Sequence, residues 1–234
     1  MVYRELAGHL GPEQPIYGLQ AQGLDGKEPY LSSVEEMAAH YLSLIRTVQP
    51  QGPYFIGGLS FGGTVAYEMA QRLQAQGEHV ALLFMFDTFP GTYESDFSLL
   101  VKLSRMPLRD QADYVVRKIH HFVTTLRRRL NRLFFPKGLK NVRMGIEQAG
   151  FRYVMRPYPG SLVLFRAKEK SLRGTRDPYA GWKGLAGGDV EVHEIPGGHV
   201  SILAEPQVQI LAKHLRNCIQ RASAEAVEQE VCNS

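Results

Sequence analysis

The sequence predicts an α/β fold in which a mostly parallel sheet is covered by helices on both faces. In the first half of the chain, short apolar runs of strand length alternate with segments of helical periodicity. The run at 79–86 is apolar almost throughout, as in parallel strands that are buried on both faces. Strand signals stop near residue 90 and resume after residue 150. We therefore expect one domain over residues 1–234, with a helical lid inserted at 90–150.

Each element is predicted from its periodicity and from the residues that end it. A helix is expected where apolar side chains recur every three or four residues and a proline or glycine follows. A strand is expected where roughly four to eight apolar residues stand between turn-forming residues. The expected strands are 15–19, 53–57, 79–86, 161–165 and 190–195; the expected helices are 2–10, 34–48, 64–76, 98–106, 109–134, 139–154 and 206–222, with a polar tail after Ala222.

Composition and charge are those of an ordinary globular chain. Hydrophobic residues make up 44% and charged residues 21% of the sequence. No apolar stretch approaches the roughly 18 residues of a membrane span, and the first residues lack the apolar core of a signal peptide, so we expect a cytoplasmic protein. The net charge of +4 comes with a basic concentration at 117–143. Both an acidic partner and a solvated helix face are consistent with it.

The strongest chemical signal is Gly58-Leu59-Ser60-Phe61-Gly62, a G-x-S-x-G sequence between an apolar strand and an amphipathic helix. In that setting the glycines allow a sharp turn that lifts the serine hydroxyl above the sheet. The helix N-terminus directs backbone N–H groups at any oxyanion that forms there, and the Phe61 N–H is the expected donor. We predict that Ser60 is the nucleophile of a serine hydrolase with the α/β-hydrolase fold. A plain glycine-rich turn is the alternative.

A serine nucleophile needs a base, and the base needs an orienting acid. The fold places them in the chain order Ser, acid, His. Asp87 follows the run 79–86 directly, at the carboxyl end of a strand, where α/β active sites assemble. Capping of the next turn is its alternative role. Among eight histidines, His199 stands on a glycine-rich loop after the last strand, whereas His193 alternates within that strand. We therefore predict Asp87 as the acid and His199 as the base.

Motifs for other chemistries are missing from the sequence. It has no H-E-x-x-H, no Cys/His cluster, no G-x-x-x-x-G-K-[ST] loop and no dinucleotide-binding fingerprint. Its two cysteines, Cys218 and Cys232, are expected to be free thiols. We therefore expect neither a metal nor a bound cofactor.

With these residues placed, the sequence resembles the type I thioesterase domains that end nonribosomal peptide and polyketide synthetases. The resemblance implies that Ser60, Asp87 and His199 stand where the family's triad stands, and that 90–150 is the variable lid over an acyl pocket. It covers nearly the whole chain and rests on the segments 3–7, 15–20, 52–54, 57–63, 66–70, 158–160, 164–167, 181–182 and 196–199.

The resemblance also implies a substrate and a partner. An acyl or peptidyl chain would arrive on the phosphopantetheine arm of a carrier protein, pass to Ser60 as an ester, and leave as an acid, lactone or lactam. The expected partner is thus an acyl or peptidyl carrier protein and not a nucleic acid. Two alternatives to this predicted function remain open: an editing thioesterase that clears misloaded carriers, and a non-catalytic fragment that only binds a carrier within a larger synthetase.

The sequence departs from the family pattern at one place, near the N-terminus. In the family a core strand and a Gly- or Pro-rich loop precede the helix that begins at Tyr3, and that loop supplies a second oxyanion donor. This chain starts two residues before Tyr3, so we expect the strand and the donor to be missing from it. The expected consequence is a dynamic N-terminal third, or direct pairing of 15–19 with 53–57. Either leaves the Phe61 N–H as the sole assured donor.

Overall fold

The computed structural model describes residues 2–91, 136–169 and 177–233. Of these, 2–19, 34–91, 153–169 and 177–233 belong to one compact unit, and 20–33 with 136–152 belong to another. The helices expected at 98–106 and 109–134 lie outside the described residues, as does most of the basic concentration. The lid at 90–150 therefore stays a prediction.

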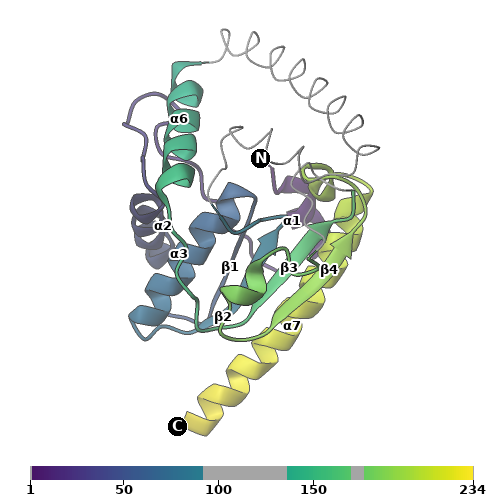
Figure 1. Cartoon of the computed structure of the whole chain (residues 1–234). Helices are drawn as coiled ribbons and strands as arrows, with labels where there is room; N and C mark the ends of the chain where they lie inside the picture. The colour runs from purple at the N-terminus through teal and green to yellow at the C-terminus, as the bar shows by residue number, and fades with distance from the viewer. Residues whose placement is uncertain (1, 92–135, 170–176, 234) are drawn as a thin grey trace, which may run out of the picture. The chain divides into compact units, whose positions relative to one another are not determined.

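A parallel sheet forms the centre of the first unit, with its strands in the order β1-β2-β3-β4 (Figure 1). Residues at the carboxyl ends are in register across it: Leu59 pairs with Phe86, and Phe86 pairs with Phe165. The carboxyl ends of the strands therefore meet at one edge of the sheet. Four of the five predicted strands and their parallel direction are confirmed: β1 Tyr54–Leu59, β2 Val80–Phe86, β3 Leu162–Ala167 and β4 Val190–Ile195.

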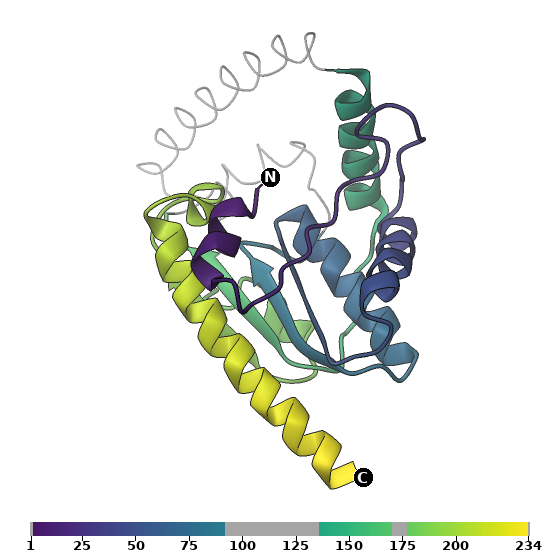
Figure 2. The same cartoon turned by 180° about the vertical axis from the view of Figure 1, so that it is seen from behind.

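Helices cover both faces of this sheet, as predicted. Leu82 and Phe86 of β2 pack against the α1 and α7 side, whereas Met85 of the same strand lies beside Gly63 of α3. This alternation is the period of two that places successive strand residues on opposite faces. Figure 2 shows α7 and α1 together on one face. The helices are α1 Arg4–Leu10 and α7 Gln207–Asn233 on that face, and α2 Val34–Val48 and α3 Phe61–Ala75 on the other; η3 Trp182–Gly184 and η4 Ser201–Leu203 are single 3₁₀ turns.

Helix α7 is longer than predicted. The helix end predicted at Ala222 is wrong, because the polar residues after it continue the helix to Asn233, past the end of the sheet (Figure 1). Ala222 and Ala226 are both buried, so the helical periodicity of small apolar residues continues beyond the predicted end. None of the helices in the described part of the chain combines the length and the apolar character that crossing a membrane requires.

The strand predicted at 15–19 is also wrong. These residues have no regular secondary structure, and Ile16, Tyr17 and Leu19 are exposed. Within the described residues β1 pairs with β2 alone, so neither its pairing with 15–19 nor any rearranged sheet is present. An apolar run becomes a strand only where a neighbouring strand can satisfy its backbone groups, and this run has none.

In the second unit, helix α6 (Lys137–Arg152) packs against the segment 20–33. Gly138 and Gly145 stand two helical turns apart, on one face of α6. A Cβ atom at Gly138 would come within 2.4 Å of the Leu24 carbonyl oxygen, and one at Gly145 within 2.5 Å of the Leu31 carbonyl oxygen. The two glycines therefore allow the helix backbone to lie directly on this segment. The structure confirms the helix that was expected at 139–154.

Candidate active site

Ser60 connects β1 to α3 in a strained backbone conformation. Its φ is 54° and its ψ is −120°, a combination that non-glycine residues rarely adopt and that costs about 1–3 kcal/mol. The Ser60 N–H donates to the Phe86 carbonyl oxygen at 2.9 Å, so the turn begins in register with β2. The hydroxyl makes no capping bond to α3. Strain that the surrounding structure maintains, at a half-buried serine, marks this turn as a candidate for chemistry.

The glycines around Ser60 have different roles. A Cβ at Gly58 would come within 2.5 Å of the Gly62 carbonyl carbon, and one at Gly63 within 2.2 Å of Thr88 Oγ1. At Gly62 the nearest atom, Tyr3 Oη, would be 3.7 Å away. The close approach of β1 to α3 therefore requires glycine at Gly58 and Gly63. The last glycine of the G-x-S-x-G motif is not required by packing.

Asp87 and His199, distant in sequence, are in contact. Asp87 Oδ2 lies 2.7 Å from His199 Nδ1, and Asp87 Oδ1 accepts a hydrogen bond from the Ala167 N–H at 3.0 Å. The Asp87 side chain is only 2% exposed, and its backbone has a φ of 44°, a conformation that aspartate tolerates better than most residues. Two donors thus hold both carboxylate oxygens of a buried acid.

The contact determines which nitrogen of His199 remains available. A carboxylate only accepts hydrogen bonds, so Nδ1 carries the proton and Nε2 has a free lone pair. The loop that carries the imidazole turns at Gly197, where φ is 97°, and the Gly198 N–H donates to Ser201 Oγ at 2.7 Å. The His199 side chain is 36% exposed, against 2% for Asp87. The pair therefore presents a basic nitrogen at the surface from a buried carboxylate.

Two residues support this arrangement without taking part in the contact. The Thr88 hydroxyl has the Ser60 carbonyl oxygen as its nearest acceptor, at 3.1 Å, and so links the strand end of β2 to the serine turn. The indole N–H of the fully buried Trp182 donates to the Thr88 carbonyl oxygen at 2.8 Å. Our sequence analysis did not single out Thr88; its place directly after the predicted acid is the signal that was available.

Tyr3 also supports the serine turn. The Leu59 N–H points away from β2, at the free edge of β1, and donates to Tyr3 Oη at 2.9 Å. Burial raises the pKa of the Tyr3 hydroxyl above its ordinary value, and the Leu59 hydrogen bond opposes that rise. A side chain thus supplies the acceptor that a neighbouring strand would otherwise provide.

The predicted site residues therefore share one edge of the sheet. Ser60 and Asp87 follow the adjacent strands β1 and β2, and His199 follows β4. This is the edge at which α/β sheets bind ligands. Phe61 is the first residue of α3, where the early N–H groups of a helix have no intrahelical acceptor. The structure brings Asp87 and His199 into contact, and it places Ser60 and Phe61 at the helix N-terminus.

Comparison with known proteins identifies the family. The family model for the thioesterase domain matches residues 1–218. Two similar proteins of Mortierella alpina are malpibaldin synthetase, 32% identical over 222 residues, and malpinin synthetase, 34% identical over 226 residues. These matches cover 94% and 92% of this chain, but only 4% and 3% of the two synthetases.

A solved structure agrees with this match. The NocB thioesterase domain, in covalent complex with a fluorophosphonate nocardicin G analog, is 26% identical with a TM-score of 0.68. The match covers 93% of this chain and 88% of that one. Both the predicted α/β-hydrolase fold and the predicted resemblance to synthetase thioesterase domains are confirmed. The chain belongs to the thioesterase-domain family.

Proposed function

We propose that this domain releases an acyl or peptidyl chain from the phosphopantetheine arm of a carrier protein, through an acyl ester on Ser60. The observation that carries the proposal is the 2.7 Å contact between His199 Nδ1 and Asp87 Oδ2, at the sheet edge where the strained Ser60 turn lies. Membership of the thioesterase-domain family and the likeness to two synthetases support a thioester substrate. No cofactor enters this scheme.

In the acylation step, His199 Nε2 takes the proton of the Ser60 hydroxyl while Oγ attacks the thioester carbonyl carbon. The buried Asp87 carboxylate holds the imidazole in the required tautomer and stabilises the imidazolium that forms. The Phe61 N–H and the positive end of the α3 dipole stabilise the oxyanion. The C–S bond then breaks, and the imidazolium returns its proton to the departing carrier thiol.

In the second step, the same groups work on an oxygen or nitrogen nucleophile. His199 Nε2 deprotonates either water or a hydroxyl or amine of the bound chain, and that group attacks the Ser60 ester. Collapse of the second tetrahedral intermediate returns the proton to Ser60 Oγ. Water gives a free acid, and an internal nucleophile gives a lactone or lactam.

Covalent labelling tests the nucleophile. The purified chain should take up one fluorophosphonate group, located on Ser60 by peptide mass spectrometry, and Ser60→Ala should take up none. Ser43→Ala, which changes an exposed serine of α2, is the matched control and should label as the unchanged chain does. Undiminished labelling of folded Ser60→Ala would refute the acyl-enzyme. A folded wild-type chain that does not label would favour the carrier-binding fragment.

Turnover with acyl-loaded carrier proteins tests the substrate. A chain-releasing domain should prefer a long acyl or peptidyl group on the carrier, and the product mass should distinguish the acid from a cyclic product by one water. Faster hydrolysis of short acyl carriers than of long ones would instead support the editing thioesterase. Ser60→Ala provides the background rate for both measurements.

A further inference from the structure

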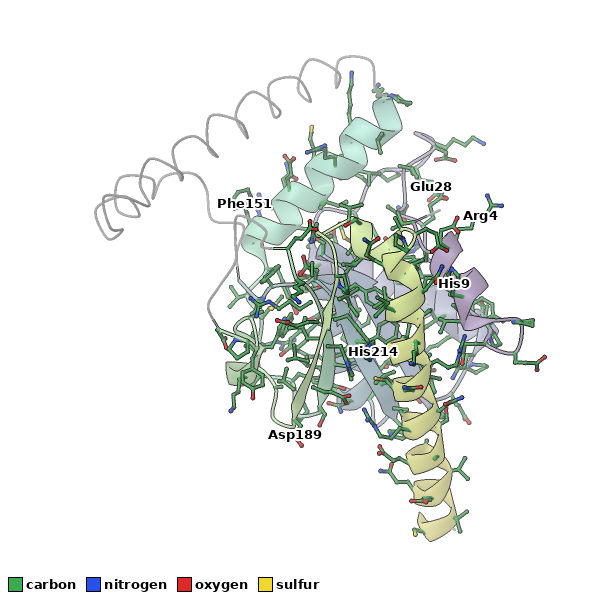
Figure 3. The ribbon with its side chains drawn as sticks, turned by 90° about the vertical axis from the view of Figure 1, so that its right-hand side faces the viewer. Arg4, His9, Glu28, Phe151, Asp189 and His214 are labelled. Atoms are coloured by element: carbon green, nitrogen blue, oxygen red, sulfur yellow. The ribbon has the colours of Figure 1, made fainter. Side chains whose placement is uncertain are left out.

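A second group of chemically versatile side chains lies between β4 and α7. Glu191 and His193 are two residues apart on β4, so their side chains point to the same face of the strand. His214 and Cys218 are four residues apart on α7, so they share one face of the helix. Figure 3 shows His214 on α7 beside the strands. The four residues therefore meet where β4 and α7 face each other, within the first unit.

Three donor atoms converge in this group. His193 Nε2 lies 2.8 Å from Glu191 Oε1 and 3.6 Å from Cys218 Sγ. One ligand atom from each of these three residues lies within 4.8 Å of the others. The His214 ring centre is 4.8 Å from that of His193. A carboxylate oxygen, an imidazole nitrogen and a sulfur thus face a common point.

The convergence indicates what could occupy that point. A carboxylate oxygen, an imidazole lone pair and a thiolate are all electron-rich, so a shared proton or a cation is needed to hold them together. A proton on His193 Nε2 can serve Glu191, with Cys218 Sγ as a more distant neighbour at 3.6 Å. A metal cation can use all three atoms at once.

The neighbouring residues hold the group in position. Arg221 contacts Oε2 of Glu191, the oxygen that does not face His193, and so acts as the outer partner that ligating carboxylates commonly have. The His193 ring is stacked on Phe165, with ring centres 5.2 Å apart and planes at 17°. Cys218 is buried, at 2% exposure. The imidazole and the sulfur are therefore fixed before any ion arrives.

The distances suit a small transition metal. With Zn–N near 2.0 Å and Zn–S near 2.3 Å, tetrahedral geometry separates nitrogen and sulfur by roughly 3.5 Å. The observed separation of His193 Nε2 and Cys218 Sγ is 3.6 Å. Nitrogen and oxygen ligands would stand roughly 3.3 Å apart, so Glu191 would have to withdraw by about 0.5 Å. The Glu191 side chain is 37% exposed and has room to do so.

We propose that Glu191, His193 and Cys218 bind a divalent cation of the zinc class and link β4 to α7. Sulfur and imidazole ligands favour zinc and its neighbours over magnesium or calcium. A carboxylate and a thiolate neutralise the divalent charge, which allows Arg221 to remain beside them. The site is structural and does not depend on the proposed hydrolase chemistry. The sequence showed no metal motif because the ligands come from two separate elements.

Cobalt substitution tests the sulfur ligand directly. Addition of Co²⁺ to the metal-free protein should produce the near-ultraviolet charge-transfer absorption of a thiolate–cobalt bond and the visible bands of a tetrahedral ion. Zinc should abolish both by displacement. Absence of the thiolate–cobalt absorption in the folded protein would overturn the proposal, and the outcome is independent of any hydrolase activity.

Zinc titration calorimetry of matched variants tests the ligand set. Cys218→Ser and His193→Ala should each weaken zinc binding by at least about 100-fold, since even an outer partner of a ligand is worth about 10–100-fold. Cys232→Ser changes the exposed cysteine, and His199→Ala removes a histidine that is paired with a different carboxylate; both should bind zinc as the wild type does. Equal zinc affinity of wild type and Cys218→Ser would overturn the proposal, and tight zinc binding lost in His199→Ala would place the ion at the catalytic pair instead.

Discussion

Two of the histidine–carboxylate pairs in the described part of the first unit, Asp87–His199 and Glu191–His193, differ in which nitrogen the carboxylate contacts. Asp87 contacts Nδ1 of His199 at 2.7 Å, whereas Glu191 contacts Nε2 of His193 at 2.8 Å. The first contact leaves Nε2 of His199 free to act on a third group. In the second, the carboxylate already occupies the nitrogen that faces the third group. Although the two distances are nearly equal, the Asp87–His199 pair keeps one imidazole nitrogen free for a third group. The Glu191–His193 pair uses the nitrogen on which the three donor atoms converge.

The third residue of each group, Ser60 beside one pair and Cys218 beside the other, also differs in its exposure and backbone. Ser60 stands on a strained turn at a helix N-terminus, where backbone N–H groups face outward. Cys218 is inside α7 and buried, and this burial, with the nearby Glu191, raises the pKa of its thiol. A buried thiol with a raised pKa is a poor nucleophile. Exposure and local backbone, more than residue type, distinguish the candidate nucleophile from the structural cysteine.

The largest expected effect separates the two histidines. His199→Ala should lower kcat for thioester turnover by about 10⁴–10⁶-fold, because it removes the group that we propose as the general base. His193→Ala should leave most of the turnover, since its Nε2 is engaged by Glu191. Release of the carrier thiol measures both rates, with Ser60→Ala as background. A larger loss in His193→Ala than in His199→Ala would reverse the assignment of the base.

A smaller effect should separate the two carboxylates. Asp87→Asn should lower kcat by about 10⁴-fold, because an amide can donate to Nδ1 and so favours the wrong tautomer of His199. Glu191→Gln leaves the His199 imidazole untouched and should keep turnover near the wild-type value. Both substitutions preserve side-chain size, so unfolding curves should confirm that each variant remains folded. Comparable losses of kcat in the two variants would show that the pairs are not functionally distinct.

The comparison also explains which features were predictable from sequence. Ser60, Asp87 and His199 each carry a local signal: a glycine-flanked serine, an acid directly after an apolar run, and a histidine on a glycine-rich loop. Parallel strands bring their carboxyl ends to one edge, so local signals suffice to place these residues together. No comparable rule brings the residues of the Glu191 group together. The contact between a strand and a helix fifteen or more residues later depends on how the helix packs against the sheet.

The wrong predictions have physical causes as well. The run at 15–19 has strand composition, but no neighbouring strand is there to accept its backbone groups, so Ile16 and Tyr17 remain exposed. The tail after Ala222 was judged by its polarity, although its alanine, glutamate and glutamine residues favour helix and no glycine or proline interrupts them. The polarity of a segment indicates whether it lies in solvent, whereas its helix propensity indicates which backbone conformation it adopts.

The smallest expected effect concerns the hydrogen bond between the Leu59 N–H and Tyr3 Oη, which supports the turn at Ser60 and not the Cys218 group. Tyr3→Phe removes the hydroxyl that accepts a hydrogen bond from the Leu59 N–H. Leu59 directly precedes Ser60, and its partly buried N–H is left unsatisfied. The free energy of unfolding should fall by about 1–3 kcal/mol, measured by urea denaturation. Tyr17→Phe removes the hydroxyl of a tyrosine that is 68% exposed, and should change it by less than about 0.5 kcal/mol.

The same two variants show whether this support reaches the nucleophile. Because Leu59 directly precedes the strained Ser60, loss of its hydrogen bond should also slow fluorophosphonate labelling in Tyr3→Phe, while zinc affinity at the Cys218 group stays unchanged. That group is carried by a regular helix and strand, whose backbone hydrogen bonds do not involve Tyr3. Equal unfolding free energies for Tyr3→Phe and Tyr17→Phe would mean that water satisfies the Leu59 N–H, and that the turn at Ser60 is maintained without the Tyr3 hydrogen bond.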